Sequence, residues 1–194
     1  MKIVLATSNK DKVREIKEIL GESIDIYTTD DFDLGKFEVE EDGDTLKENA
    51  YKKAKYLYNI LKMPTLADDT GLFVKSLNLR PGVYSHRYAG ENPTYKDNRN
   101  KLLNELKEFD NRDAYFKTSV CFIDKDGKDY YFDGKIDGQI CEKEYGDKDF
   151  GYDQIFRVKE IGKTFGQMTY EEKNLYSHRY LALEKFKNFL LKED

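Results

Sequence analysis

The sequence predicts an α/β fold in which a mixed β-sheet core is flanked by helices. Short apolar runs, typical of buried strands, alternate along the chain with amphipathic helical segments. Two β-rich segments, 113–123 and 128–141, flank a turn signal at 124–127, as expected for a β-hairpin. No linker, low-complexity tract or long repeat interrupts the 194 residues. This length predicts a single domain over 1–194.

The first predicted element is a short buried strand over 2–6. The segment 7–9 then offers three helix-capping side chains, and the apolar spacing after it predicts a helix that ends at Gly21. A second strand is expected over 24–27. The segment 30–44 is acidic and irregular, and we expect Phe37 and Val39 to be its buried residues.

A long helix is predicted next by its own N-terminal signal. Thr45 and Glu48 have the spacing of a capping box, and apolar residues then recur on one helical face until Pro64 ends the pattern. The apolar run 65–67 is typical of a buried strand. The polar segment 68–71 is expected at the end of that strand.

The rest of the chain continues the alternation of strands, turns and helices. A turn is indicated at 81–82, and Pro93 predicts the first turn of a helix that runs to about Glu108. The segment 150–153 is interpreted as a loop. A last helix is predicted after Ser177, which has the residue type of an N-cap.

Composition and charge exclude several classes of function. The 33 Lys and Arg residues against 38 Asp and Glu give a net charge of -5, which argues against binding of nucleic acid polymers. No apolar run approaches the roughly 20 residues that span a membrane, and the apolar start is too short for a signal peptide. Cys121 and Cys141 indicate neither a disulfide framework nor a zinc site, so a cytoplasmic location is expected.

The segment 7–9, together with Lys12, is a first candidate binding site. A strand that ends in small polar residues and enters a helix presents backbone N–H groups to an anion. Lys12 lies about one turn into the helix and is within reach of a phosphate. The same residues also fit an ordinary helix cap followed by a solvated lysine, which is the interpretation that the segment alone favours.

A second candidate is a set of four carboxylates, Glu40, Glu41, Asp68 and Asp69. The two aspartates follow a predicted buried strand, which is where open α/β sheets place their ligands. Adjacent strand residues point to opposite faces, so we expect one aspartate to face a given site. Two carboxylates from separate segments can hold Mg²⁺ together with phosphate oxygens and water. The alternative is a solvated loop for the glutamates and a turn for the aspartates.

Two further segments carry side chains suited to a purine base. The segment 150–153 places two aromatic rings around a glycine, and an aromatic face can stack on a nucleobase. A core aromatic that anchors a turn is the alternative. His178 and Arg179 are expected in the first turn of the last helix, where a cation opposes the helix dipole. Such a locally unfavourable position indicates function, with a solvent-exposed first turn as the alternative.

Taken together, these segments resemble the Ham1-like family of inosine/xanthosine triphosphate pyrophosphatases from one end of the chain to the other. The matching motifs are, in order, 5–9 with Lys12, Glu41, 45–50, 67–71, 81–85, 87–90, 150–153, 168–169, 172–173 and 177–179. Each motif is weak alone, and their shared order is specific.

The resemblance implies a two-lobed architecture with an active-site cleft between the lobes. It implies hydrolysis of noncanonical purine nucleoside triphosphates (ITP, dITP and XTP) to the monophosphate and pyrophosphate, with Mg²⁺ and by a homodimer. The implied metal-side carboxylates are Glu41 and Asp69, and Asp69 is also the implied general base. The implied phosphate or sugar contacts are Thr7, Ser8, Asn9, Lys12, Lys53, Thr70 and Lys173. The implied base contacts are Phe150, Gly151, Tyr152, Asp153, His178 and Arg179.

The chain departs from the family pattern inside two of these motifs and directly after a third. Ser8 stands where the family usually has glycine, Thr70 where serine is common, and Gln154 where proline is usual. Two other functions stay open: a purine-nucleotide sensor that binds without hydrolysis, and a Maf-like nucleotide pyrophosphatase, whose motifs match less well. The presence of both Asp69 and Lys173 argues against a sensor, because a sensor needs no general base.

Overall fold

The computed structural model describes residues 1–21, 24–32, 34 and 37–193, with the side chain of residue 193 left out. Part of the predicted acidic segment 30–44 therefore lies outside the described residues. The chain divides into two units. The first unit comprises Met1–Asp69, Thr118–Gly134 and Arg179–Asp194, and the second unit comprises Thr70–Lys117 and Lys135–His178.

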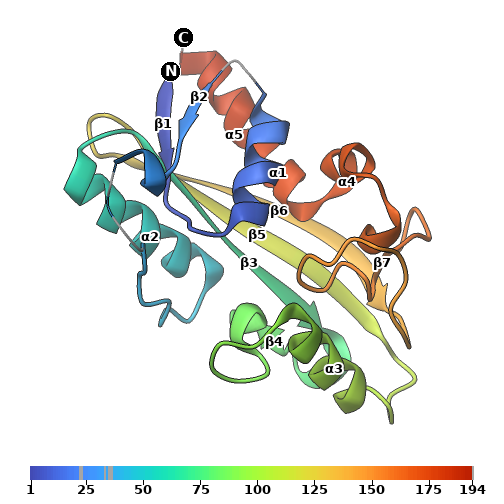
Figure 1. The fold of residues 1–194 in the computed structure, drawn as a ribbon. Helices are drawn as coiled ribbons and strands as arrows, with labels where there is room; N and C mark the ends of the chain where they lie inside the picture. Colours follow the sequence, from blue (N-terminus) through green and yellow to red (C-terminus); the bar gives the residue numbers. More distant parts are fainter. Residues whose placement is uncertain (22–23, 33, 35–36, 194) are drawn as a thin grey trace. The chain divides into compact units, whose positions relative to one another are not determined.

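A mixed β-sheet with the strand order β2-β1-β3-β5-β6-β7 runs through the described residues, and β4 pairs with β3 (Figure 1). The strands are β1 (Lys2–Leu5), β2 (Asp25–Tyr27), β3 (Thr65–Val74), β4 (Pro81–Gly82), β5 (Asp113–Ile123), β6 (Asp129–Ile140) and β7 (Phe156–Val158). β1 is parallel to β2 and β3, whereas β4 is antiparallel to β3 and β7 is antiparallel to β6. The predicted fold class, an α/β fold around a mixed sheet, is confirmed.

Five α-helices accompany this sheet within the described residues. They are α1 (Lys10–Leu20), α2 (Leu46–Leu61), α3 (Tyr95–Glu105), α4 (Tyr170–Tyr176) and α5 (His178–Glu193). Among the helices that the structure describes, none has both the length and the apolar character to cross a membrane.

In the first unit, β1 lies between two apolar layers. Ile3 and Leu5 pack in one cluster with residues of α1 and α5, whereas Val4 and Ala6 pack in another with residues of α2. This division follows from the strand itself, because successive side chains point to opposite faces. Figure 1 shows α1 and α5 on one side of β1 and α2 on the other. Both faces of the chain are therefore buried over residues 3–6, which explains why the sequence is continuously apolar there.

The second unit has an apolar core that is rich in aromatic rings. Phe116 of β5 meets Phe156 of β7 edge to face, with 4.7 Å between the ring centroids. The ring centroids of Phe165 and Phe156 are 5.5 Å apart, and Leu102 of α3 belongs to the same cluster. Large rings thus supply the core of a chain in which only 39% of residues are hydrophobic.

β3 is longer than the sequence predicts. The expected strand over 65–67 continues to Val74, so the segment 68–71 lies inside the strand and its predicted place at the strand end was wrong. Gly71 allows β4 to approach this strand closely, because a Cβ atom there would lie 2.6 Å from the carbonyl oxygen of Gly82 in β4. The polar residues of this segment therefore sit on a rigid element in the middle of the sheet.

Helix starts were predicted with mixed success. Thr45 forms a capping box with Glu48 at the start of α2, as expected. The start of α3 was wrong: Thr94 caps this helix in a second capping box with Asp97, so Pro93 precedes the helix. The capping pair satisfies the first N–H groups of α3, and this was a stronger signal than the proline.

Candidate active site

The turn from β1 to α1 is a capped helix start. Asn9 is the N-cap, and its side-chain oxygen accepts hydrogen bonds from the backbone N–H groups of Asp11 and Lys12 at 3.0 and 3.1 Å. Thr7 Oγ1 accepts a hydrogen bond from the Asn9 N–H at 3.2 Å, and Ser8 is exposed. The helix cap of the alternative interpretation is confirmed, but its solvated lysine was wrong, because the Lys12 side chain is only 15% exposed and pairs with Asp68. The role of this segment in phosphate binding stays a prediction.

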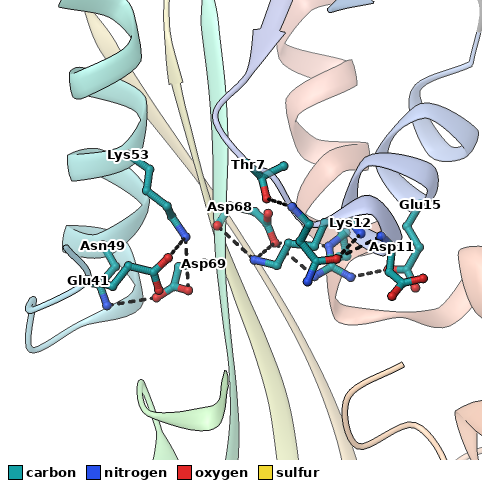
Figure 2. Close-up of polar contacts among 11 residues, drawn as sticks. Thr7, Asp11, Lys12, Glu15, Glu41, Asn49, Lys53, Asp68 and Asp69 are labelled. Carbon is teal, nitrogen blue, oxygen red and sulfur yellow. Dashed lines mark hydrogen bonds and ion pairs between the residues drawn. The ribbon is translucent and has the colours of Figure 1, made fainter. Parts of the chain in front are cut away.

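Asp68 is held on one side of β3 by two cations. Its Oδ2 atom lies 3.2 Å from Nζ of Lys12 and accepts hydrogen bonds from Nε and NH2 of Arg179 at 3.3 and 3.1 Å. NH1 of Arg179 donates to Glu15 of α1. The side chains of Glu15, Asp68 and Arg179 are each 1% exposed. Figure 2 shows Asp68 directed toward Lys12, with Glu15 beyond it. These four residues form a buried charge cluster, which we call the Asp68 cluster.

The Asp68 cluster fixes the charge of its central carboxylate. Burial alone would raise the pKa of Asp68, but the positive charges of Lys12 and Arg179 overcome this effect and hold the pKa well below its usual range. Burial lowers the pKa of Lys12, and the Asp68 charge opposes that shift. Asp68 is therefore ionised at neutral pH and is a poor proton acceptor.

Asp69 lies on the opposite side of β3 with different partners (Figure 2). Its Oδ2 atom accepts a hydrogen bond from Asn49 Nδ2 at 3.2 Å, and its Oδ1 atom lies 3.6 Å from Nζ of Lys53. The same Nζ atom donates to Glu41 at 2.9 Å. The backbone N–H of Gly43 donates to Asn49 Oδ1 at 2.8 Å and so orients this amide toward Asp69. We call Glu41, Asn49, Lys53 and Asp69 the Asp69 cluster.

The Asp69 cluster shifts the pKa of its central carboxyl in the opposite direction. Burial raises the pKa of Asp69, Lys53 opposes this shift, and the charge of Glu41 adds to it. Burial would lower the pKa of Lys53, but the charges of Asp69 and Glu41 prevail and raise it. A carboxylate with a raised pKa beside a permanent cation is suited to accept a proton from water.

The Asp69 cluster also has the donors to hold a divalent cation. Within the part of the chain that the structure describes, no group of three or more His, Cys, Asp or Glu side chains could enclose a metal ion. Glu41 and Asp69 nevertheless approach the same ammonium group, with oxygens at 2.9 and 3.6 Å from Nζ of Lys53. Mg²⁺ commonly takes one or two carboxylates and completes its coordination with water and phosphate oxygens. Glu41 and Asp69 fit such an ion. Glu40, another of the four candidate carboxylates, is exposed.

The predicted aromatic loop lies in the second unit. Tyr152 is buried, and its hydroxyl donates to the backbone carbonyl of Ser85 at 2.8 Å. Asp153 forms a buried ion pair with Lys173 of α4, and Nζ of Lys173 lies 4.9 Å from the centroid of the Phe150 ring. Tyr152 thus anchors the loop in the core, which was the alternative interpretation for an aromatic residue here. Phe150 is half-buried and is the better candidate for stacking on a base.

Two predicted base-contacting residues at the start of α5 belong to different units. His178 belongs to the second unit and stacks on Phe116, with 4.5 Å between centroids and 15° between planes. Arg179 belongs to the first unit, where two carboxylates compensate its unfavourable place at a helix N-terminus. Ser177 separates α5 from α4, a helix that was not predicted. The first-turn position of both residues is confirmed, and their contact with a base stays a prediction.

Sequence reasoning missed Glu15 and Asn49, which complete the two clusters. Glu15 lies one turn beyond Lys12 on α1, and Asn49 lies one turn before Lys53 on α2. Residues three or four apart share a helix face, so the spacing from each chosen lysine was an available signal. Thr70, the remaining predicted contact, is half-buried in the part of β3 that belongs to the second unit.

The fold and these motifs define a known class of protein. A model described as the Ham1 family matches residues 3–189, and the chain belongs to this family. It is 46% identical to the dITP/XTP pyrophosphatase of Thermoanaerobacter sp. (strain X514), over 99% of this chain and 98% of that protein. It is 44% identical to the dITP/XTP pyrophosphatase of Geobacter sulfurreducens, over 97% of this chain and 96% of that protein. The solved structure of the Staphylococcus aureus Ham1 protein matches with a TM-score of 0.89 and 36% identity over 100% of both chains. The resemblance inferred from the motifs is confirmed.

Proposed function

We propose that this chain hydrolyses noncanonical purine nucleoside triphosphates, such as ITP, dITP and XTP, to the nucleoside monophosphate and pyrophosphate. The observation that carries the proposal is the Asp69 cluster, in which a buried carboxyl with a raised pKa lies beside Lys53 and Glu41. The names of the relatives described above support the same substrate class. Such an enzyme would clear deaminated purines from the nucleotide pool. A cytoplasmic homodimer is part of the proposal and rests on the family resemblance.

The proposed reaction is attack of a water molecule on the α-phosphorus. Asp69 accepts a proton from the water while the water oxygen bonds to the α-phosphorus. The bond between the α-phosphorus and the oxygen that bridges to the β-phosphate breaks, which releases pyrophosphate. Lys12 and Lys53 supply positive charge to the triphosphate. General-base assistance of this kind is worth roughly 10²–10⁴-fold in rate.

The proposal includes Mg²⁺, with Glu41 and Asp69 as its protein ligands. When bound, this ion neutralises negative charge on the phosphate oxygens and helps to orient the leaving group. Two carboxylates are a sufficient protein contribution, because the nucleotide itself brings phosphate oxygens. The further phosphate or sugar contacts in the proposal are Thr7, Ser8, Asn9, Thr70 and Lys173.

Discrimination between bases is proposed to depend on the purine 6-position. Hypoxanthine and xanthine carry a carbonyl acceptor there, whereas adenine carries an amino donor. Arg179 has donors only, and His178 can donate from a ring nitrogen, so both favour the carbonyl. With adenine, these donors would face the 6-amino group, which is itself a donor, and no hydrogen bond could form. The segment 150–153 supplies the remaining base contacts, with Phe150 as the stacking ring.

The test is pyrophosphate release from ITP, XTP, ATP and UTP with and without Mg²⁺. We expect Mg²⁺-dependent release of pyrophosphate and monophosphate from ITP and XTP, with much lower kcat/KM for ATP. A nucleoside diphosphate as first product would contradict the proposed bond cleavage. Tight binding of ITP without turnover would instead identify a sensor, and a preference for UTP would favour the Maf-like alternative.

A further inference from the structure

A buried arginine of the second unit joins α3 to the segment that carries the aromatic loop. Arg99 lies in the middle of α3, and its side chain is 3% exposed. Its Nε donates to Glu144 at 2.6 Å, its NH2 lies 2.6 Å from Asp149, and its NH1 donates to the backbone carbonyl of Gly151 at 2.9 Å. One guanidinium group thus contacts three points of the segment 144–151.

The contact with Gly151 falls on the part of the loop that side-chain packing cannot hold. Gly151 has a left-handed backbone with a φ of 57°, and a Cβ atom placed there would meet nothing within 4 Å. Its neighbours are anchored in other ways, since Phe150 packs edge to face on Tyr95 of α3, and the Tyr152 hydroxyl bonds the Ser85 carbonyl. The carbonyl that Arg99 binds lies between these two anchors.

The chemistry of the guanidinium suits this task. Its donors form a planar fork with fixed directions, so three acceptors held at once define one geometry for the segment that carries them. Hydrogen bonds from a charged donor are about twice as strong as neutral ones. Asp149 is 65% exposed, and the carboxylate partners offset the cost of burying the charge of Arg99.

We propose that Arg99 is a positioning residue that fixes the conformation of the segment 149–153 and thereby sets which purine base is accepted. This inference rests on the proposed function, because it assumes that the loop contacts the base. Arg99 itself touches no reacting atom in this proposal. Its loss should therefore change KM and base preference far more than kcat.

Arg112 provides a matched control in the same unit. Its guanidinium also donates to three acceptors, the backbone carbonyls of Ile140, Leu106 and Cys141, at 2.7, 3.0 and 2.9 Å. It has the same donor chemistry as Arg99 but bonds to none of the residues 149–153 in these contacts. Arg112→Gln therefore reports the effect of losing a three-point arginine contact on the stability of the unit alone.

The experiment compares Arg99→Gln with Arg112→Gln in the full chain. We expect Arg99→Gln to raise KM for ITP about 10-fold or more, to leave kcat within about 3-fold, and to lower the ITP/ATP ratio of kcat/KM by a similar factor. Inhibition by inorganic triphosphate, which has no base, should be unchanged in the presence of Mg²⁺. Amide hydrogen exchange at 150–153 should become faster in Arg99→Gln and stay as in the wild type in Arg112→Gln.

Four outcomes decide the matter. An unchanged ITP/ATP ratio in a folded Arg99→Gln protein overturns the inference, as does an equal fall of that ratio in Arg112→Gln. If Arg99→Gln does not fold, Arg99→Lys and Asp149→Asn replace it. The inference is also overturned if both of these variants keep the wild-type KM for ITP and the wild-type rate of amide hydrogen exchange at 150–153. If the wild-type chain does not discriminate ITP from ATP, the proposed function fails. Loop exchange then still tests whether Arg99 positions the segment.

Discussion

Asp68 and Asp69 follow one another along β3 and carry the same side chain, yet their partners differ in kind. Asp68 meets two cations, Lys12 and Arg179, whose charges hold its pKa well below the usual range. Asp69 meets an amide and one lysine that it shares with Glu41, and burial raises its pKa. One strand therefore presents a carboxylate with a lowered pKa on one face and a carboxyl group with a raised pKa on the other.

The difference teaches that residue type and position in the sequence do not decide which carboxylate acts in chemistry. The alternation of a strand separates the two side chains, and each face then supplies its own charges. A carboxylate surrounded by cations is stabilised in its charged form and is suited to structure. A buried carboxylate with fewer cationic partners keeps the proton affinity that a general base requires.

The largest expected effect comes from removing the proposed proton acceptor. Asp69→Asn keeps the shape of the side chain but cannot accept the proton and is a poorer ligand for Mg²⁺, so kcat for ITP should fall by roughly 10²–10⁴-fold or more. The melting temperature should stay close to that of the wild type. Retention of most of the kcat at saturating Mg²⁺ would transfer the general-base role to another carboxylate.

Asp68→Asn should lower the stability of the fold, in contrast to Asp69→Asn. It leaves the buried cations of Arg179 and Lys12 without their shared carboxylate, and breaking a buried ion pair of this kind costs about 3–5 kcal/mol of unfolding free energy. Urea unfolding of this variant beside Asp69→Asn is the measurement. A loss below about 1 kcal/mol would mean that the Asp68 cluster contributes little to stability.

Arg179→Ala would sharpen the assignment of the Asp68 cluster. If Arg179 also contacts the 6-carbonyl, kcat/KM for ITP and XTP should fall about 10- to 150-fold, since one charge-assisted hydrogen bond is worth roughly 1.5–3 kcal/mol. ATP makes no such bond and should be affected much less. Glu15→Gln is the control, because it weakens the same cluster and keeps the arginine. Equal losses for ITP and ATP would place Arg179 outside base recognition.

The smallest expected effect is the acid dependence of stability. The folded-state pKa of Asp68 lies below its unfolded value of about 3.9, so its contribution is complete above that value and is lost as the pH falls toward the folded-state pKa. The difference in unfolding free energy between the wild type and Asp68→Asn should therefore shrink below about pH 4. Denaturation curves from pH 7 to pH 3 measure it. A difference that does not change with pH would contradict the lowered pKa.

Local signals allowed correct prediction of much of the fold. The capping box of Thr45 and Glu48 was readable because both partners lie within one helical turn. The extent of β3 was not readable, because a run of two aspartates, threonine and glycine is typical of a turn. A strand tolerates these charges here because Lys12 and Arg179 neutralise Asp68 from 56 and 111 positions away.

The candidate site shows the same limit. The resemblance, through the order of the motifs, predicted Asp69, Glu41 and Lys53 as site residues. Spacing alone could not show that one ammonium group lies near both carboxylates. The carboxylate partners of Arg179 could not be inferred either, since Glu15 is 164 positions away along the chain. Helix periodicity reveals neighbours on one element, whereas pairing between elements depends on the tertiary fold.

The path of the chain through its two units has a consequence for protein synthesis. The chain passes from one unit to the other four times, so neither unit is a continuous segment. A ribosome releases β1 early and α5 late, yet Ile3 and Leu5 of β1 pack in the same apolar layer as Leu183 and Phe186 of α5. The first strand of the sheet must therefore wait until α5 has been synthesised before its layer can close.

A nascent chain that stopped before α5 would lack more than packing. It would miss Arg179 as well, so Glu15 and Asp68 would lose the guanidinium that joins them. Incomplete products would thus expose an apolar strand face beside two acidic side chains that have lost a cationic partner, which is a condition that favours recognition by chaperones and proteases. The first unit, which is discontinuous in sequence, therefore cannot complete this charge cluster before α5 has been made.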